Sequence, residues 1–398
     1  MYRPLLKFLP AFAVTISLVP VIAISQDVST DSGTKQNTAA ETESAVQAMI
    51  EKLSSTRFSD RQDATKQLLN VNADAVSLIE KAAASAIGET QSRLRMILPQ
   101  LRKRLFDDQL AAFLAKPAVE TAERLPQWNR FELISGHDDD ALSIFGQVLS
   151  AERGLFAARL FAPNELSAML ESRSAEIARE CHGRADEEFP IASVAALMLL
   201  GSEPEIHLRR ATSTNISSAL DDPRFNKLIT DGVHSHSLRA IVEAWIVRSG
   251  IAAERPLLFS MQHGLHAGRN VATRIIKSKS SRPDMILSLL CLADLNCTDD
   301  LPLIESLFDN ETVLWPQKGQ IVRNLEPGAP PLDAHYTVQT RDVALAAAAH
   351  LRKIKPEDVG MKVRSSDVSL FAVDSLGFSS DEARSDSLAA YRKLADVK

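Results

Sequence analysis

The stretch that decides the fold runs from Ser44 to Leu105, and it opens with SAVQAMIEKL at residues 44–53. Four apolar residues of this segment occupy the i, i+3, i+4 and i+7 positions of a helix: Val46, Met49, Ile50 and Leu53. That spacing places their side chains along one face. The segment therefore predicts a short amphipathic helix that ends near Ser54.

Three more short helices are predicted behind it. One starts at Ser59, because Ser59 and Gln62 have the spacing of a capping box. The next runs from Asp74, its N-cap, to Gly88, which closes it. The fourth is marked by apolar residues at helical spacing: Leu94, Ile97, Leu98, Leu101 and Leu105. Isolated helices shorter than about 12 to 15 residues are marginal in water, so these four must stack to fold.

The predicted fold class is all-α, an α-solenoid of stacked helical hairpins of the HEAT/armadillo kind. Seven residues at the start carry a resemblance to a divergent HEAT-type repeat: Phe58, Arg61, Ala64, Leu68, Ala75, Leu78 and Ile79. The chain has 398 residues, of which 45% are hydrophobic and 5% aromatic. Such a composition favours a core of alanine and leucine over a sheet with aromatic pairs.

Four structural regions are expected from Ser44 onward. Residues 44–106 form the N-terminal helical repeats, and residues 107–313 continue as a helical region, in which the strongly apolar segment Pro190–Leu200 predicts a buried helix. Residues 314–336 form an irregular loop, because prolines and glycines interrupt any helix there. The loop is either a functional element or a surface insertion. Residues 337–398 close the chain as a C-terminal helical region.

The first residues resemble an export signal. Arg3 and Lys7 form a basic start, Phe8–Ile22 is apolar, and Ala23-Ile24-Ser25 fits a cleavage site, so residues 1–25 are predicted to be a signal peptide cleaved after Ser25. The competing interpretation is an uncleaved membrane anchor, although the apolar run is short and contains proline. Residues 26–43 are polar and predict a disordered linker. The expected location is periplasmic or extracellular, without a membrane span after cleavage.

Charge and cysteine content narrow the classes of partner. The formal net charge is −6, and loss of the leader, which carries two basic residues and no acid, makes the mature chain more negative. A nucleic-acid partner is therefore not expected, and the basic run Arg102-Lys103-Arg104 is interpreted as a solvated helix end.

Cys181, Cys291 and Cys297 are too few for a disulfide scaffold. Cys291 and Cys297 are either a buried pair of free thiols or a disulfide.

No common catalytic motif is present. The sequence lacks GxSxG, GxxxxGK[ST], GxGxxG and HExxH, so no catalytic residue and no cofactor is predicted. Four histidines are the candidate ligands for Zn²⁺ or Cu²⁺, provided that they converge: His234, His236, His263 and His266. The alternative is that they are exposed or singly hydrogen-bonded histidines at helix ends.

Two acidic positions admit both a structural and a chemical interpretation. The run Asp138-Asp139-Asp140 has the oxygen ligands that Ca²⁺ prefers but lacks the loop spacing, so acids at a helix start are the simpler account. Asp342 and His350 would be about 12 Å apart on a helix, which is too far for a catalytic pair. Asp342 is therefore expected near a helix start, with Arg341 pairing to a neighbouring element.

A second resemblance covers the chain from about Leu125 to the C-terminus. It rests on blocks in a fixed order: Leu125–Phe131, Gly136, Asp138–Asp140, Phe145, Ala151-Glu152, Arg341–Leu345, His350-Leu351, Pro356–Gly360, Leu376–Phe378 and Arg384–Lys393. These blocks resemble an uncharacterised family of exported, HEAT-like helical-repeat proteins of planctomycete bacteria. The chain departs from the family pattern at Met361, where phenylalanine is usual, and near the end, where Tyr391 stands in place of a tryptophan. The resemblance implies a helical exported protein and no particular activity.

Together these patterns predict a noncatalytic binding or scaffolding module of the cell envelope, with a protein or another envelope component as its partner. Two alternatives stay open at this point. One is a metal-dependent hydrolase that uses the four histidines, and the other is an envelope component that assembles with copies of itself.

Overall fold

The computed structural model describes residues 34–72, 75–181, 188–249, 253–278, 282–315, 336–366 and 369–396. The predicted signal peptide lies outside these residues. The described residues form nineteen α-helices and one small antiparallel sheet, so the all-α prediction is confirmed. None of the described helices is long and apolar enough to cross a membrane.

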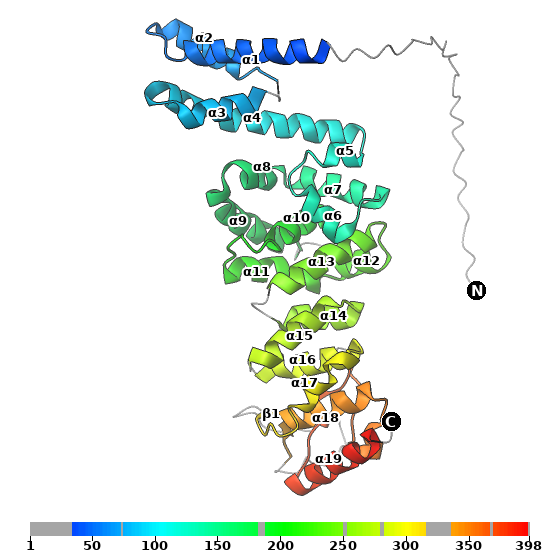
Figure 1. Cartoon of the computed structure of the whole chain (residues 1–398). Helices are drawn as coiled ribbons and strands as arrows, with labels where there is room; N and C mark the ends of the chain where they lie inside the picture. Colours follow the sequence, from blue (N-terminus) through cyan, green and yellow to red (C-terminus); the bar gives the residue numbers. More distant parts are fainter. Residues whose placement is uncertain are drawn as a thin grey trace, which may run out of the picture. The chain divides into compact units, whose positions relative to one another are not determined.

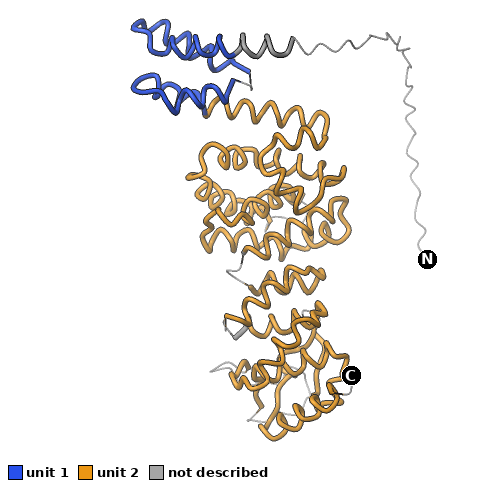
Figure 2. The backbone as a smooth tube through the Cα atoms, in the orientation of Figure 1, with its two compact units in different colours: residues 1–98 blue, residues 99–398 orange. Residues whose placement is uncertain are grey.

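The chain divides into two compact units, residues 1–98 and residues 99–398 (Figure 2). Unit 1 contains three helices and the start of a fourth: α1 (Thr34–Lys52), α2 (Phe58–Leu68), α3 (Val76–Ser85) and α4 (Gly88–Ala115). Its core comes from the predicted apolar positions, since Val46, Leu53, Leu68 and Ile79 are all fully or almost fully buried. The predicted amphipathic faces are therefore confirmed in this unit.

Several details of the first helices differ from the prediction. Helix α1 begins at Thr34, so the predicted disordered linker 26–43 is helical in its second half. Helix α2 begins at Phe58 with no side-chain cap, and the hydroxyl of Ser59 contacts Asp60, so the Ser59–Gln62 capping box is wrong. Gly88 does not close α3 but starts α4, where its φ of +61° suits glycine. The predicted N-cap Asp74 lies outside the described residues.

Helix α4 is longer than predicted, with 28 residues. The predicted boundary at residue 106 falls inside it, and the division between the units falls at Pro99 instead. Pro99 lies inside this helix, although proline lacks the amide that the helix ladder needs. The basic run Arg102-Lys103-Arg104 consequently lies within α4 and not at a helix end, and Lys103 pairs with Asp107 at 3.3 Å.

Unit 2 contains the remaining helices in chain order (Figure 1). Its elements after α4 are α5 (Val119–Ala122), α6 (Trp128–Ser135), α7 (Asp139–Ala151), α8 (Arg153–Phe161), α9 (Pro163–Cys181), α10 (Ile191–Gly201), α11 (Arg210–Ser217), η2 (Ser218–Asp221), α12 (Pro223–Asp231), α13 (Ser235–Ser249), α14 (Glu254–His263), α15 (Ala267–Ser278), α16 (Arg282–Asp294), η3 (Thr298–Asp300), α17 (Leu301–Glu305), β1 (Val313–Trp315), β2 (Val338–Gln339), α18 (Thr340–Leu351), η4 (Pro356–Val359), η5 (Val373–Ser375) and α19 (Asp381–Ala395).

Several helices of unit 2 pack on helices that lie a few elements away in the chain. Helices α7 and α13 pack on α10, and α6 and α15 pack on α13. Further along, α15, α14 and α18 pack on α16, while α17 and α19 pack on α18. The predicted buried helix is α10, in which nine residues are buried. Helices of unit 2 therefore pack both on near neighbours in the chain and, as α6 does on α13, on helices far away in sequence.

Two glycines allow neighbouring helices to approach closely. A Cβ at Gly201 would lie 2.7 Å from Cζ3 of the buried Trp245, so glycine lets α13 lie directly against the end of α10. A Cβ at Gly268 would lie 2.6 Å from the Cβ of Ser260 and 2.9 Å from Sγ of Cys291, which are on α14 and α16. These contacts fix the positions of α13 and α15 in unit 2.

The predicted irregular loop 314–336 is wrong at its first residues, because Leu314 and Trp315 belong to β1. Strand β1 pairs antiparallel with β2, with Val313 opposite Gln339 and an irregular register. Residues 316–335 lie outside the described chain. Beyond them, helices α18 and α19 match the predicted C-terminal helices, and the Ser380 hydroxyl caps α19 by accepting a hydrogen bond from the amide of Ala383.

The three cysteines are buried free thiols. This settles the open choice for Cys291 and Cys297 in favour of thiols. Burial raises the pKa of all three, that of Cys181 to about 11.

Candidate functional site

The four candidate metal ligands do not meet in the described structure. His234 Nδ1 lies 2.5 Å from Asp140 Oδ1, and its Nε2 lies 3.0 Å from the Gln147 amide nitrogen. His263 Nε2 lies 2.7 Å from Asn226 Oδ1, and its ring packs against Phe259. His236 and His266 are exposed. Among the residues that the structure describes, no group of three or more histidine, cysteine, aspartate or glutamate side chains is placed to hold a metal ion.

The Asp140–His234 pair has the geometry of a base and its orienting carboxylate, but no nucleophile completes it. The nitrogen that would face a nucleophile is in contact with the Gln147 amide, which in turn contacts the Ser143 hydroxyl at 3.4 Å. Nucleophilic catalysis needs a hydroxyl or thiol within hydrogen-bond reach of the base. The pair instead joins the start of α7 to the residue just before α13.

The acidic run caps a helix, as the simpler interpretation predicted. Asp138 is the N-cap of α7, and its carboxylate accepts a hydrogen bond of 2.8 Å from the amide of Ala141. Asp139 and Asp140 occupy the first turn, where negative charge interacts favourably with the helix dipole.

Arg341 and Asp342 also have the structural roles predicted for them. Asp342 accepts a hydrogen bond from the Gln339 amide in a capping box at the start of α18, and Arg341 pairs with Glu311 and Asp381. Burial raises the pKa of Asp342 to about 6, although the Gln339 amide and the Arg384 guanidinium oppose that shift. The carboxylate is 1% exposed and enclosed by protein groups, so it is not open to a substrate.

A groove of about 890 Å³ elsewhere in unit 2 combines open space with an excess of positive charge, since three arginines and one glutamate line it. We call it the arginine groove and define it by six of its lining residues: Arg130, Ser202, Glu243, Arg248, Asn270 and Arg274. It lies among α6, the end of α10, α13 and α15. The predicted metal ligand His266 is also on its edge, where the His266 amide donates a hydrogen bond to Glu243.

Apolar packing positions the first arginine. Trp128 and Phe131 on α6 are buried against Phe145, with ring centroids 5.1 and 4.9 Å apart. Since these residues fix the inner face of α6, Arg130 between them reaches the groove, where its Nη2 donates to the carbonyl and hydroxyl oxygens of Ser202 at 2.9 and 2.7 Å. Its Nε is buried and has no hydrogen-bond partner in the structure.

The other two arginines come from α13 and α15. Arg248 donates to the carbonyl oxygens of Glu203, Pro204 and Ile206 at 3.2 to 3.5 Å. Arg274 is exposed and donates one hydrogen bond of 3.3 Å to the carbonyl of Val247. No described carboxylate lies within 4 Å of the guanidinium of Arg130, Arg248 or Arg274.

This arrangement suits an anion. Guanidinium groups bind carboxylates and phosphates in the plane of their N–H donors. These three form no ion pair with a described carboxylate, although Glu243 lines the same groove and Arg130 interacts electrostatically with Glu203. Elsewhere in the described chain, arginines such as Arg173, Arg224 and Arg352 are paired with acids. The groove therefore carries local positive charge on a chain whose net charge is −6.

Only part of this site could be predicted from the sequence. Asn270, Arg274 and Lys277 form an i, i+4, i+7 polar stripe opposite the buried Val271, Ala272 and Ile275, so a solvated face of that helix was visible. Arg130, Arg248 and Arg274 are far apart in sequence, and only the packing of α6, α13 and α15 brings them together. Comparisons with known proteins found no matching family model, no matching curated protein and no matching solved structure.

Proposed function

We propose that this chain is an exported, noncatalytic binding module that holds an anionic partner in the arginine groove. The observation that carries the proposal is the set of three arginines that line one groove and contact only carbonyl and hydroxyl oxygens of the protein. A noncatalytic role is supported by the Asp140–His234 pair, whose second nitrogen contacts an amide. Export is supported by the leader sequence.

The arrangement proposed for the helices is a solenoid of the HEAT-like kind. It is supported by the packing of α10, α13, α15, α16 and α18, each against helices close to it in the chain. In such a stack the polar faces of successive helices line up, so that a continuous binding surface can form from residues on several repeats. The arginine groove, with residues from four elements, is a surface of this type.

Binding of oligoglutamate, measured by isothermal titration calorimetry at low ionic strength, tests the proposal. We expect the wild-type chain to bind and Arg274→Glu to lower the affinity at least tenfold, about 1.4 kcal/mol, because the exposed guanidinium is replaced by a carboxylate. Raising the salt concentration should weaken wild-type binding, since exposed charges are screened.

Arg179→Glu is the matched control. Arg179 is also exposed, lies on a helix and donates one hydrogen bond to a carbonyl, that of Ala175 at 3.2 Å, so both variants change the net charge equally. Its affinity should equal that of the wild type. Absence of wild-type binding, or an equal loss in both variants, would overturn the proposal.

A further inference from the structure

The arginine groove does not end at Arg274. Asn270 and Arg274 also line a second space of about 670 Å³, which contains Thr273, Lys277 and Asp300. Lys277 in turn lines a third space of about 530 Å³. Because neighbouring spaces share lining residues of α15, they follow one another along the exposed stripe of that helix, and we call the three together the channel.

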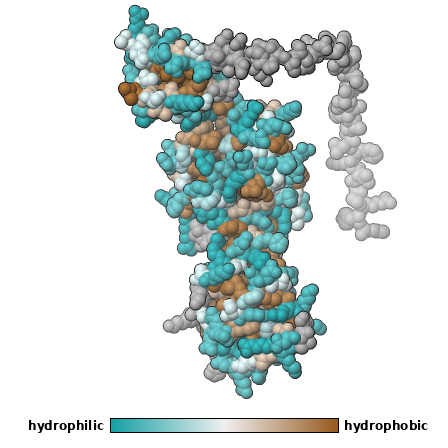
Figure 3. All heavy atoms as spheres, in the orientation of Figure 1, coloured by the Kyte–Doolittle hydropathy of each residue, from teal (hydrophilic) through white to brown (hydrophobic). Residues whose placement is uncertain are grey.

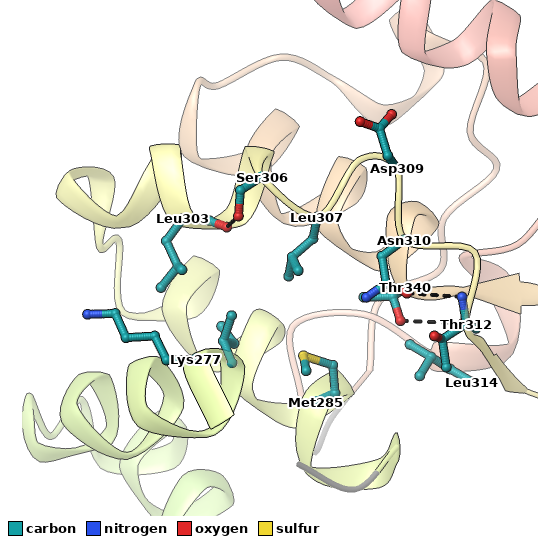
Figure 4. A pocket seen from close by; sticks show the side chains of 11 residues that line it. Lys277, Met285, Leu303, Ser306, Leu307, Asp309, Asn310, Thr312, Leu314 and Thr340 are labelled. Carbon is teal, nitrogen blue, oxygen red and sulfur yellow. Dashed lines mark hydrogen bonds between the residues drawn. The ribbon is translucent and has the colours of Figure 1, made fainter. Parts of the chain in front are cut away.

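The far end of this channel has an apolar wall and a polar edge, and Asp309 also lines it. Figure 4 shows Met285, Leu303 and Leu307 pointing into the third space from α16, α17 and the turn after it. Leu314 of β1 and the buried Ile276 complete its apolar lining. The other edge is polar, where the amide and hydroxyl of Thr340 donate to the carbonyl of Thr312 at 2.9 and 3.3 Å.

The residue that joins the two environments is Lys277. It lines both the second and the third space, so its apolar stem lies beside the aliphatic pocket while its ammonium group adds positive charge to the polar stretch. Arg269, which also lines the second space, is neutralised by Asp300 at 2.6 Å and adds no free charge. The lining of the channel thus changes along its length from a cationic stretch to a stretch with an apolar wall.

We propose that the channel binds an extended acidic peptide with a large aliphatic side chain as its anchor. This inference rests on the proposed function and adds the class of partner. The rise from Asn270 to Lys277 is about 10 Å at 1.5 Å per residue, which an extended peptide covers with about three residues. The peptide therefore places a carboxylate beside Asn270, in the stretch that Arg274 also lines, and an aliphatic residue about three positions away in the pocket.

The lining favours a peptide over other polyanions. Nucleic acids are commonly held by aromatic side chains that stack on their bases, but none of the described residues named as lining these three spaces is phenylalanine, tyrosine or tryptophan. The Asn270 amide provides a donor and an acceptor for a peptide backbone. The hydroxyls of Thr273 and Ser278 donate to carbonyls within α15 and provide acceptors only.

Fluorescence anisotropy of labelled peptides tests the inference. One peptide carries two aspartates and, three residues later, a leucine; a second has serine in place of the leucine; and both are also made in reverse order. In at least one order we expect the leucine peptide to bind the full-length protein at least tenfold more tightly than its serine partner. In Leu303→Gln the two peptides should bind alike, with the affinity of the serine peptide unchanged.

Leu388→Gln, which changes another half-buried leucine in α19, is the control and should keep the preference for leucine. Equal binding of leucine and serine peptides in both orders would overturn the inference and leave the proposed function standing. If no peptide binds, both fail. Binding of oligonucleotides with higher affinity than either acidic peptide would also overturn it.

Discussion

Two clusters of arginines in unit 2 are held in opposite ways. Around α18 and α19, Arg384 donates from Nε to both oxygens of Asp342 at 3.0 and 3.1 Å, and its Nη2 donates to Thr337 and Phe378. Arg341 and Arg352 nearby also have carboxylate partners. In the arginine groove, by contrast, the guanidinium groups contact neutral oxygens, and apolar packing holds the helices.

The difference separates charge that holds the fold from charge that is kept for a partner. A buried guanidinium with a matched carboxylate has no capacity left for a ligand, whereas one held by carbonyl oxygens keeps its net charge. The hydrophilic residues that predominate on the face drawn in Figure 3 do not make this distinction visible. The groups that each guanidinium contacts distinguish the two clusters.

The largest expected effect comes from breaking the pair around α18. Arg384→Met leaves the carboxylate of Asp342 buried without its cation, which should lower the free energy of unfolding by about 3 to 5 kcal/mol in urea titration. The double variant Arg384→Met with Asp342→Asn removes both charges and should recover part of the loss. If the single variant unfolds at the same urea concentration as the wild type, the pair does not hold this region.

A smaller effect is expected from the packing beneath the arginine groove. Gly201→Ala places a methyl group 2.7 Å from the ring of Trp245, so α13 must shift, at a cost of about 1 to 3 kcal/mol. The shift should also weaken oligoglutamate binding, because Arg248 is on α13. Gly154→Ala in α8 is the control: its Cβ meets nothing within 4 Å, and thermal unfolding should change by less than about 1 kcal/mol.

The smallest effect is a change in the pH dependence of stability. Burial, assisted by Arg239, lowers the pKa of His263 below its usual 6.5. The folded chain then binds this proton less readily than the unfolded chain, so the stability is complete above about pH 6.5 and is lost as the pH falls toward the lowered pKa. His263→Gln should therefore show a shallower loss of melting temperature between pH 7 and pH 5 than the wild type, with their difference at pH 8 as baseline.

The same titration distinguishes the two kinds of site. Arginine stays charged across this range, so binding of oligoglutamate per folded molecule should depend only weakly on pH above about 6. If binding by the folded protein falls steeply as the pH rises from 7 to 8, a titrating group, and not the arginines, controls the affinity of the groove.

Local signals in the sequence predicted individual helices well, but they did not predict which helices contact one another in space. The apolar run in α10 and the helix start near Asp342 depend on residues close in sequence, and both are present. The predicted boundary at residue 106 is wrong, because α4 continues without a stop to Ala115. The arginine groove depends on α6, α13 and α15 meeting, and no local pattern in a single sequence encodes that meeting.

The three buried thiols affect how long the protein stays folded in the presence of an oxidant. Thiolate is the reactive form, and the raised pKa values of Cys181, Cys291 and Cys297 leave almost none of it in the folded protein. Unfolding exposes all three at once, and an oxidant can then cross-link them within or between chains. A chain that is cross-linked after unfolding does not refold. Under oxidising conditions the lifetime of the folded protein is therefore governed by its rate of unfolding more than by its equilibrium stability.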